Sequence, residues 1–145
     1  MKVLFIGDIV GSIGRDTLED YLPRLKRKYQ PDVVIANGEN AASGRGITKS
    51  IFQSLLHMGV DVVTMGNHTW DQKEIFDFID ETDYLIRPAN FSDEAPGKGM
   101  TTISKNGHTL SVINLHGRTF LPPHDDPFKK ATELVKEAKE ISPLI

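Results

Sequence analysis

The sequence contains no cysteine, which excludes disulfide bonds and thiolate metal ligands. Any metal ion bound by this chain must therefore be held by oxygen and nitrogen atoms. Long apolar runs are missing as well, since none approaches the roughly 20 residues that a membrane-spanning helix needs. The apolar run at residues 3–6 is short and Asp8 follows it closely, which is not typical of a signal peptide. We expect a cytoplasmic protein that does not contact a membrane.

An excess of positive charge is also lacking, because 17 lysines and arginines face 20 acidic residues and give a net charge of -3. This balance gives no electrostatic reason to expect general nucleic-acid binding. A basic run at residues 24–28 lies on a predicted helix, where we interpret it as a solvated face. The 145 residues are 39% hydrophobic and 26% charged, which indicates one globular domain, residues 1–145.

The first half of the chain alternates short apolar runs with helical patterns. The runs at residues 3–6, 33–36 and 60–65 are rich in β-branched residues and predict buried parallel strands. The apolar positions that recur at helical spacing are Leu18, Leu22, Leu25 and Tyr29, followed by Ile51, Leu55 and Met58. Thr48 and Gly59 are typical of the two ends of the second helix. This order predicts an α/β fold with a mostly parallel sheet.

The pattern changes after residue 70. Asp71 and Glu74 resemble a capping box that opens a helix through residue 79. Residues 100–105 and 109–115 predict a hairpin around Asn106-Gly107. A loop over residues 116–125 precedes an N-cap at Asp126. The apolar face expected for the helix that follows comprises Phe128, Ala131, Val135 and Ala138. Residues 142–145 repeat the helix-exit and strand-entry layout of residues 30–35, which indicates a further strand that is cut short.

Polar residues follow each of the three predicted parallel strands. These candidate site residues are Asp8, Glu39, Asn40, Asn67 and His68. Because the carboxyl ends of parallel strands meet at one edge of a sheet, we expect their side chains to lie close together. Their oxygen and nitrogen atoms suit a hard or borderline divalent metal ion. Two neighbouring carboxylates repel each other unless a cation or a proton intervenes, so the sequence favours a metal centre.

Other interpretations of the same residues remain open. Each acid or amide alone is also typical of a helix cap or a turn. The glycine-rich segment at residues 7–14 joins a strand to a helix, as in a dinucleotide-binding site. Its spacing differs from G-x-G-x-x-G, the Walker lysine is absent, and Asp8 would repel a phosphate. A nucleotide-binding domain without metal is therefore the less favoured alternative.

The polar blocks also carry a family resemblance. The Gly-Asp-Ile-Val-Gly segment at residues 7–11 and the Gly-Asn-His segment at residues 66–68 resemble signature blocks of the calcineurin-like metallophosphoesterases. Glu39, where most of that superfamily carries an aspartate, resembles the YmdB branch. Further segments that look like this branch are residues 66–71, 87–91 and 117–121. The resemblance covers nearly the whole chain.

The resemblance implies a role for each candidate residue. Asp8 would bind one metal ion, Glu39 would bridge two ions, and Asn40 would complete the shell of the first. Asn67 would bind the second ion, and His68 would be the general acid that protonates the leaving oxygen. The implied cofactors are two divalent ions, iron or manganese first and magnesium or zinc as options. The implied reaction opens 2′,3′-cyclic nucleotides, a small-molecule substrate, to 3′-phosphates.

The sequence departs from the family in one respect. Members complete their metal shells with three further histidines in the second half of a much longer chain, and this sequence has no counterpart to them. We therefore expect a metallophosphoesterase-type layered α/β fold whose second sheet is incomplete. His116 and His124, in the late loop, are the remaining histidines that could approach the site. His57 and His108 are expected to be bystanders.

Two further side chains have open interpretations. Arg118 could bind a substrate phosphate, because its fork matches phosphate oxygens, or it could brace the loop. Trp70 is expected to pack beside the site rather than to stack on a base.

Two functional hypotheses follow. In the first, the complete protein is a metal-dependent phosphodiesterase, and this chain alone is inactive because it carries half of the catalytic residues. In the second, the chain is a catalytically incomplete fragment that binds metal weakly or serves in assembly. An unfinished sheet would leave apolar surface and unpaired backbone groups, which a homo-oligomer would cover.

Overall fold

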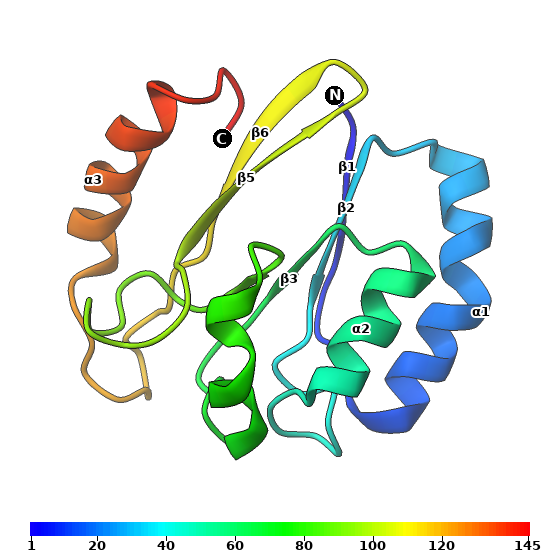
Figure 1. Cartoon of the computed structure of the whole chain (residues 1–145), viewed down its shortest axis with the longest axis horizontal. Coiled ribbons are helices and arrows are strands. Elements are labelled where there is room, and N and C mark those ends of the chain that lie inside the picture. The colour runs from blue at the N-terminus through cyan, green and yellow to red at the C-terminus, as the bar shows by residue number, and fades with distance from the viewer.

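The computed structural model describes all 145 residues, and its architecture is α/β with a mostly parallel sheet, as predicted (Figure 1). The parallel sheet has the order β1-β2-β3-β4. Its strands are β1 (Val3–Ile6), β2 (Val33–Asn37), β3 (Val62–Thr64) and β4 (Leu85–Ile86). The antiparallel pair is β5 (Met100–Lys105) and β6 (His108–Ile113). The α-helices are α1 (Gly11–Tyr29), α2 (Lys49–Met58) and α3 (Pro127–Lys139).

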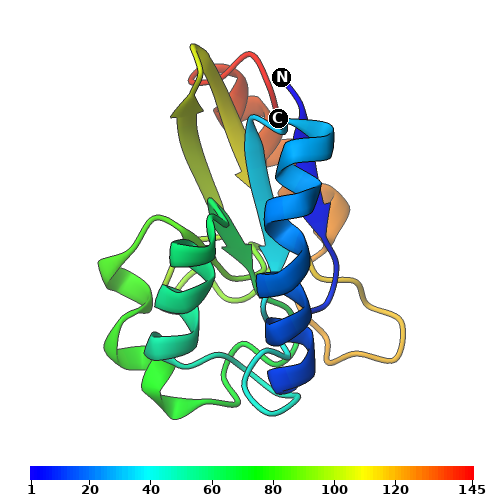
Figure 2. The same ribbon diagram turned by 90° about the vertical axis from the view of Figure 1, so that its right-hand side faces the viewer.

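The helices α1 and α2 lie on one side of the parallel sheet, and β5, β6 and α3 lie on the other (Figures 1 and 2). Successive strand residues point to opposite faces, so each face has its own core. A cluster of 16 buried residues fills the helix side and includes Val34 and Val63. A cluster of five fills the hairpin side and includes Val33 and Val62. None of the helices is long and apolar enough to cross a lipid bilayer.

Several predicted element boundaries are confirmed by specific contacts. Thr48 caps α2 by accepting a hydrogen bond from Ile51 N at 3.3 Å. Gly59 ends α2 with φ 97°, a left-handed conformation that glycine adopts without strain. Asp126 Oδ1 accepts from Phe128 N at 2.8 Å and caps α3. Local sequence chemistry therefore determines where these helices begin and end.

The predicted hairpin is also confirmed. Asn106 and Gly107 have φ values of 52° and 77°, as a tight two-residue hairpin turn requires. Near the end of the chain, Leu144 forms a parallel bridge with Leu110. The strand-entry pattern at residues 142–145 thus corresponds to strand-like pairing in the structure.

The expectation of a fully buried first strand is wrong. The side chains of Val3 and Phe5 are 46% and 58% exposed. The reason is the strand order, which places β1 at the edge of the sheet, where one of its faces is left open. Tyr29 is also exposed, because the 19-residue helix α1 runs about 28 Å and extends past the short strands beneath it.

Two further expectations are corrected, and one strand was not predicted. Phe128 is 77% exposed in the first turn of α3, whose buried residue is Ala138 near the other end. The helix expected to open at a capping box consists of two 3-10 helices, Lys73–Asp77 and Ile79–Glu81, and no side chain caps either of them. Phe78 separates them with φ -142°, which is not helical. Strand β4 was not expected, because two residues are too short to show a periodicity.

Candidate metal centre

The loops that follow the parallel strands meet at one edge of the sheet. The register pairs Ile6 with Ala36 and Asn37 with Thr64, so the strands β1, β2 and β3 end at the same level. Backbone hydrogen bonds join the loops beyond them: Gly38 N donates to Thr64 O at 2.9 Å, and Ile9 N donates to Asn37 O at 3.1 Å. The residues directly after each strand are thereby held at a common edge.

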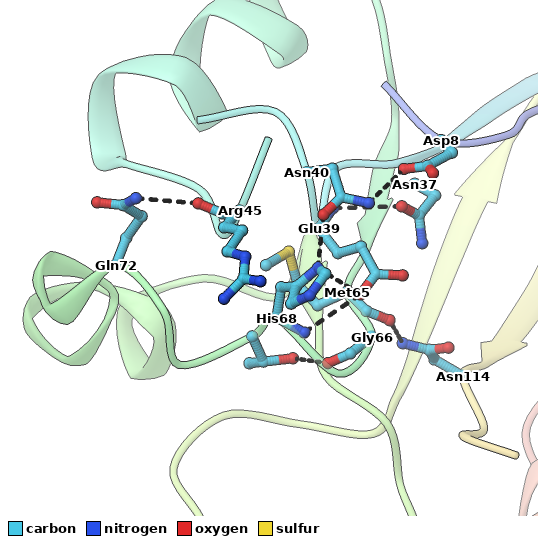
Figure 3. A network of polar contacts seen from close by, with 11 residues as sticks. Asp8, Asn37, Glu39, Asn40, Arg45, Met65, Gly66, His68, Gln72 and Asn114 are labelled. Atoms are coloured by element: carbon cyan, nitrogen blue, oxygen red, sulfur yellow. Dashed lines mark hydrogen bonds and ion pairs between the residues drawn. The ribbon is translucent and has the colours of Figure 1, made fainter. Parts of the chain in front are cut away.

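Four of the five candidate site residues form one hydrogen-bonded network at this edge (Figure 3). Asn40 Nδ2 donates to Asp8 Oδ1 at 2.9 Å. The other end of that amide, Asn40 Oδ1, lies 2.6 Å from His68 Nδ1. The backbone N–H of His68 donates to Glu39 Oε2 at 3.2 Å, and the same oxygen lies 3.8 Å from His68 Nδ1. We call Asp8, Glu39, Asn40 and His68 the edge network.

The remaining candidates lie outside the edge network. Asn67 precedes His68 on the same loop, is exposed and makes no side-chain hydrogen bond with the four residues. Arg118 lies on the late loop, where its Nη1 is 3.5 Å from Asp126 Oδ2. That ion pair corresponds to the loop-bracing interpretation of Arg118.

The carboxylate of Glu39 lies directly against the backbone of Gly66. A Cβ placed on Gly66 would be 2.3 Å from Glu39 Oε1, closer than two such atoms can approach. The backbone N–H of Glu39 also donates to Asn37 Oδ1 at 3.2 Å, which fixes the start of the loop. A side chain at position 66 would therefore displace the carboxylate, and the glycine is required by the site.

Asp8 adopts a strained backbone. Its φ of 32° lies in the left-handed region, which costs free energy for a residue with a side chain. Strain of this kind persists where the surrounding structure enforces it, and it concentrates at functional sites. Here Ile9 N is tied to Asn37 O and the Asp8 carboxylate to Asn40, so contacts on both sides hold the conformation.

The edge network matches a divalent metal ion in donor type. It offers two carboxylates, one amide and one imidazole, which are oxygen and nitrogen ligands for a hard or borderline cation. The Glu39 carboxylate fills the space beside Gly66 that a Cβ on that residue would take. This close packing holds the carboxylate in a fixed position, as a metal ligand requires. No three histidine, aspartate or glutamate side chains lie close enough together to hold an ion among them. The edge network thus has the donor types of part of a metal shell.

Neither late-loop histidine hydrogen-bonds to the edge network. His116 is 6% exposed, and both of its ring nitrogens are buried without a hydrogen-bond partner. Its ring packs 5.5 Å from Phe91 and 5.1 Å from His124. Burial, and then the charge of His124, lower the pKa of His116 below its ordinary value. The neutral imidazole is therefore favoured.

Two supporting side chains were not identified from the sequence. Asn114 Nδ2 donates to Met65 O at 2.6 Å and to Ile86 O at 3.2 Å, which ties β6 to the ends of β3 and β4. Thr69 Oγ1 donates to Gly66 O at 2.6 Å and holds the turn beneath Glu39. The sequence signal for Asn114 is a polar residue within an apolar strand pattern, and Thr69 carries no comparable signal.

Comparison with known proteins identifies the family. The sequence profile of the YmdB-like protein family matches residues 4–145. The chain belongs to this family. The family predicted from the sequence blocks is thus confirmed. Among curated proteins, a 2′,3′-cyclic-nucleotide 2′-phosphodiesterase of Bacillus subtilis (strain 168) is 60% identical over 145 residues, which are 100% of this chain and 55% of that protein. The chain spans about half the length of the curated relatives it matches.

Solved structures support the same assignment. A hypothetical protein from Thermus thermophilus superposes with a TM-score of 0.87 and 40% sequence identity, covering 94% of this chain and 53% of that one. A novel phosphatase from Mycoplasma pneumoniae superposes with a TM-score of 0.86 and 35% identity, covering 94% and 51%. The YmdB-like chain therefore has the fold of its relatives over nearly all of its residues.

Proposed function

We propose that the complete protein is a dinuclear-metal phosphodiesterase that hydrolyses 2′,3′-cyclic nucleotides to 3′-phosphates. The observation that carries this proposal is the edge network, in which two carboxylates from separate strand ends share hydrogen bonds with one amide and one imidazole. The 60% identity to a protein named for that activity supports the substrate class. The share of that relative covered by this chain, 55%, leaves room for further ligands in a complete protein.

In this proposal, each residue of the site has a separate role. Asp8 and Asn40 would hold one ion, Asn67 would hold a second, and Glu39 would serve both. Iron or manganese is favoured for the two positions. When bound, such ions neutralise the carboxylates and the charge of the phosphate, and they activate water for attack on phosphorus.

His68 would donate the proton that the leaving oxygen requires. Its Nδ1 is occupied by Asn40 Oδ1 at 2.6 Å, which orients the ring and leaves Nε2 for the substrate. Imidazole suits this task because its ordinary pKa lies near neutrality. Opening the cyclic ester to a 3′-phosphate breaks the bond between phosphorus and the ribose 2′-oxygen, and the proton on Nε2 passes to that oxygen.

The test uses the complete protein loaded with manganese or iron. Wild-type protein should convert 2′,3′-cyclic nucleotides to 3′-phosphates. Asp8→Asn and Glu39→Gln should lose bound metal and turnover together, whereas His68→Ala should keep the metal and lose turnover by roughly 100-fold or more. Metal-replete Asp8→Asn protein with full turnover would refute the metal roles, and an unchanged rate for His68→Ala would remove its assigned role.

A second candidate function, assembly without catalysis, is favoured by one observation. A largely apolar groove of about 520 Å³ lies between the exposed face of β1 and strand β6, and Phe5 and Val112 are among its lining residues. A second polypeptide could cover this surface. The mass of the 145-residue chain in solution tests the idea. A monomer that hydrolyses substrate at the rate of the complete protein would dismiss it.

A further inference from the structure

The loop between the second strand and α2 is a tight turn that presents Arg45. Three of its residues, Ser43, Gly44 and Gly46, have φ values of 53°, 92° and 72°. Ala42 N donates to Gly46 O at 2.9 Å, which closes the turn. The segment is thus a compact structure built on left-handed residues, and Arg45 lies at its tip.

The backbone of Arg45 is fixed from several sides. Its N–H donates to Ala42 O at 3.0 Å, and its carbonyl accepts from Gln72 Nε2 at 2.9 Å. The next residue, Gly46, donates its N–H to Glu39 O, so Arg45 emerges beside a residue of the edge network. A Cβ on Gly46 would be 2.9 Å from Gln72 N, which shows how closely the two loops pack.

The side chain of Arg45, in contrast, has no partner. It is exposed, forms no ion pair and donates no hydrogen bond. Figure 3 shows it extending from the loop toward His68. The remaining arginines are bonded to carbonyls (Arg15 and Arg87), paired with Asp126 (Arg118) or located in the second half of α1 (Arg24 and Arg27).

We propose that Arg45 binds the non-bridging phosphate oxygens of the substrate and orients the phosphate toward His68. This proposal rests on the proposed function. A guanidinium presents two parallel N–H donors that match two phosphate oxygens, and it remains charged at every physiological pH. Because it keeps its protons, Arg45 neutralises the phosphate without competing with His68 for proton transfer. The hydrogen bond from Gln72 holds the loop in position.

In this proposal, Arg45 and His68 have different roles at the phosphate. A phosphodiester carries one negative charge, and cleavage to a monoester adds negative charge to the phosphoryl oxygens. Arg45 would meet that charge from the loop after β2, and His68 would protonate the departing 2′-oxygen from the loop after β3. The phosphate-binding role that the sequence suggested for Arg118 is assigned by this geometry to Arg45.

The experiment compares metal-loaded wild-type protein with Arg45→Gln, Arg45→Lys and a surface control, Arg27→Gln. The measurements are kcat and KM for a 2′,3′-cyclic nucleotide, the inhibition constant of inorganic phosphate, and metal content. Arg45→Gln should lower kcat/KM roughly 10- to 100-fold and weaken phosphate binding, with metal content unchanged. Arg45→Lys should fall between, and added guanidinium ions should partly restore Arg45→Gln. Arg27→Gln should behave as wild type.

Three outcomes would overturn the proposal. In the first, Arg45→Gln keeps the wild-type kcat/KM and phosphate inhibition. In the second, it loses metal, which would make Arg45 a structural residue. In the third, Arg27→Gln is equally impaired, so that net charge alone matters. If wild-type protein does not hydrolyse cyclic nucleotides, the proposed function fails, but calorimetric binding of inorganic phosphate to the metal-loaded variants still decides the role of Arg45.

Discussion

The two halves of the chain contribute differently to the molecule. The sheet half, residues 1–91, contains every member of the 16-residue core cluster and the whole edge network. The hairpin half, residues 98–145, contributes a single residue, Leu110, to the five-residue cluster between the halves. The difference indicates that the parallel strands position the chemistry, whereas the hairpin half covers the second face of the sheet.

Polar contacts join the halves in addition to the five-residue apolar cluster. Asn114 reaches across to the ends of β3 and β4, and Asn90 bonds to His116. Lys105 Nζ lies 2.7 Å from Asp61 Oδ1, and the second carboxylate oxygen of Asp61 accepts from Val34 N at 2.9 Å. Because such contacts are directional, they fix how the hairpin half sits on the sheet more than they add to stability.

The largest difference in activity is expected between glycine-to-alanine variants of the two halves. Gly66→Ala would place a Cβ 2.3 Å from Glu39 Oε1, so the carboxylate must move. A displacement of about 1 Å can cost roughly 100-fold in rate, and we expect at least that loss in turnover together with weaker metal binding. Gly117→Ala is the matched control, since no heavy atom lies within 4 Å of the added Cβ. Equal activity of the two variants would contradict the position assigned to Glu39.

Truncating a core side chain should lower the free energy of unfolding more in the sheet half than in the hairpin half. Leu55 is fully buried in the large cluster, so Leu55→Ala should lower the free energy of unfolding by about 3–4 kcal/mol. Leu110→Ala should cost about 2 kcal/mol, because its site in the small cluster can collapse more easily. Urea unfolding of both variants measures the difference. If Leu110→Ala were the more damaging change, the hairpin half would be the main core of the fold.

The same contrast governs what the sequence could predict. In the sheet half, continuous runs of β-branched and apolar residues located the strands β1, β2 and β3, and apolar positions at helical spacing located α1 and α2. The polar residues at the strand ends predicted the edge network. The exposure of Phe5 was missed, because a strand pattern does not tell which strand lies at the edge. Strand β4 was missed because two residues carry no period.

Several features around the edge network escaped prediction, because they depend on tertiary contacts. Arg45 is one basic residue among 17, and only the fold of its loop brings it to the edge network. For Arg118 the sequence left phosphate binding and loop bracing equally open, and its pairing with Asp126 could not be read from sequence spacing. The same holds for Asn90, whose partners lie 26 and 35 residues away.

Asn90 offers a way to loosen the contact between the halves. Its Nδ2 donates to His116 O and Asp125 O, both at 3.0 Å, and its Oδ1 accepts from His116 N at 2.8 Å. Asn90→Ala leaves these groups unpaired and should cost about 2 kcal/mol of unfolding free energy. Amide hydrogen exchange should quicken over residues 116–125 and not over β2. Ser104→Ala, at an exposed bond to Thr109, is the control and should change stability by less than about 0.5 kcal/mol.

The smallest effect expected is a pH dependence that arises in the hairpin half. Burial lowers the pKa of His116 in the folded protein below its ordinary value of 6.5. As the pH falls below about 6.5, the unfolded chain therefore binds a proton that the folded chain excludes. The free energy of unfolding should decrease over this range and continue to decrease until the folded-state pKa is reached.

Replacing the histidine separates this effect from other titrations. His116→Gln removes the group, so its stability should fall less than that of wild type between pH 7 and pH 5. His57→Gln is the control, because that ring is exposed on α2 in the sheet half and bonded only to Gln53 O. Urea midpoints at several pH values give both slopes. A wild-type slope in His116→Gln would mean that His116 binds its proton equally well in the folded and the unfolded chain, and that burial does not lower its pKa.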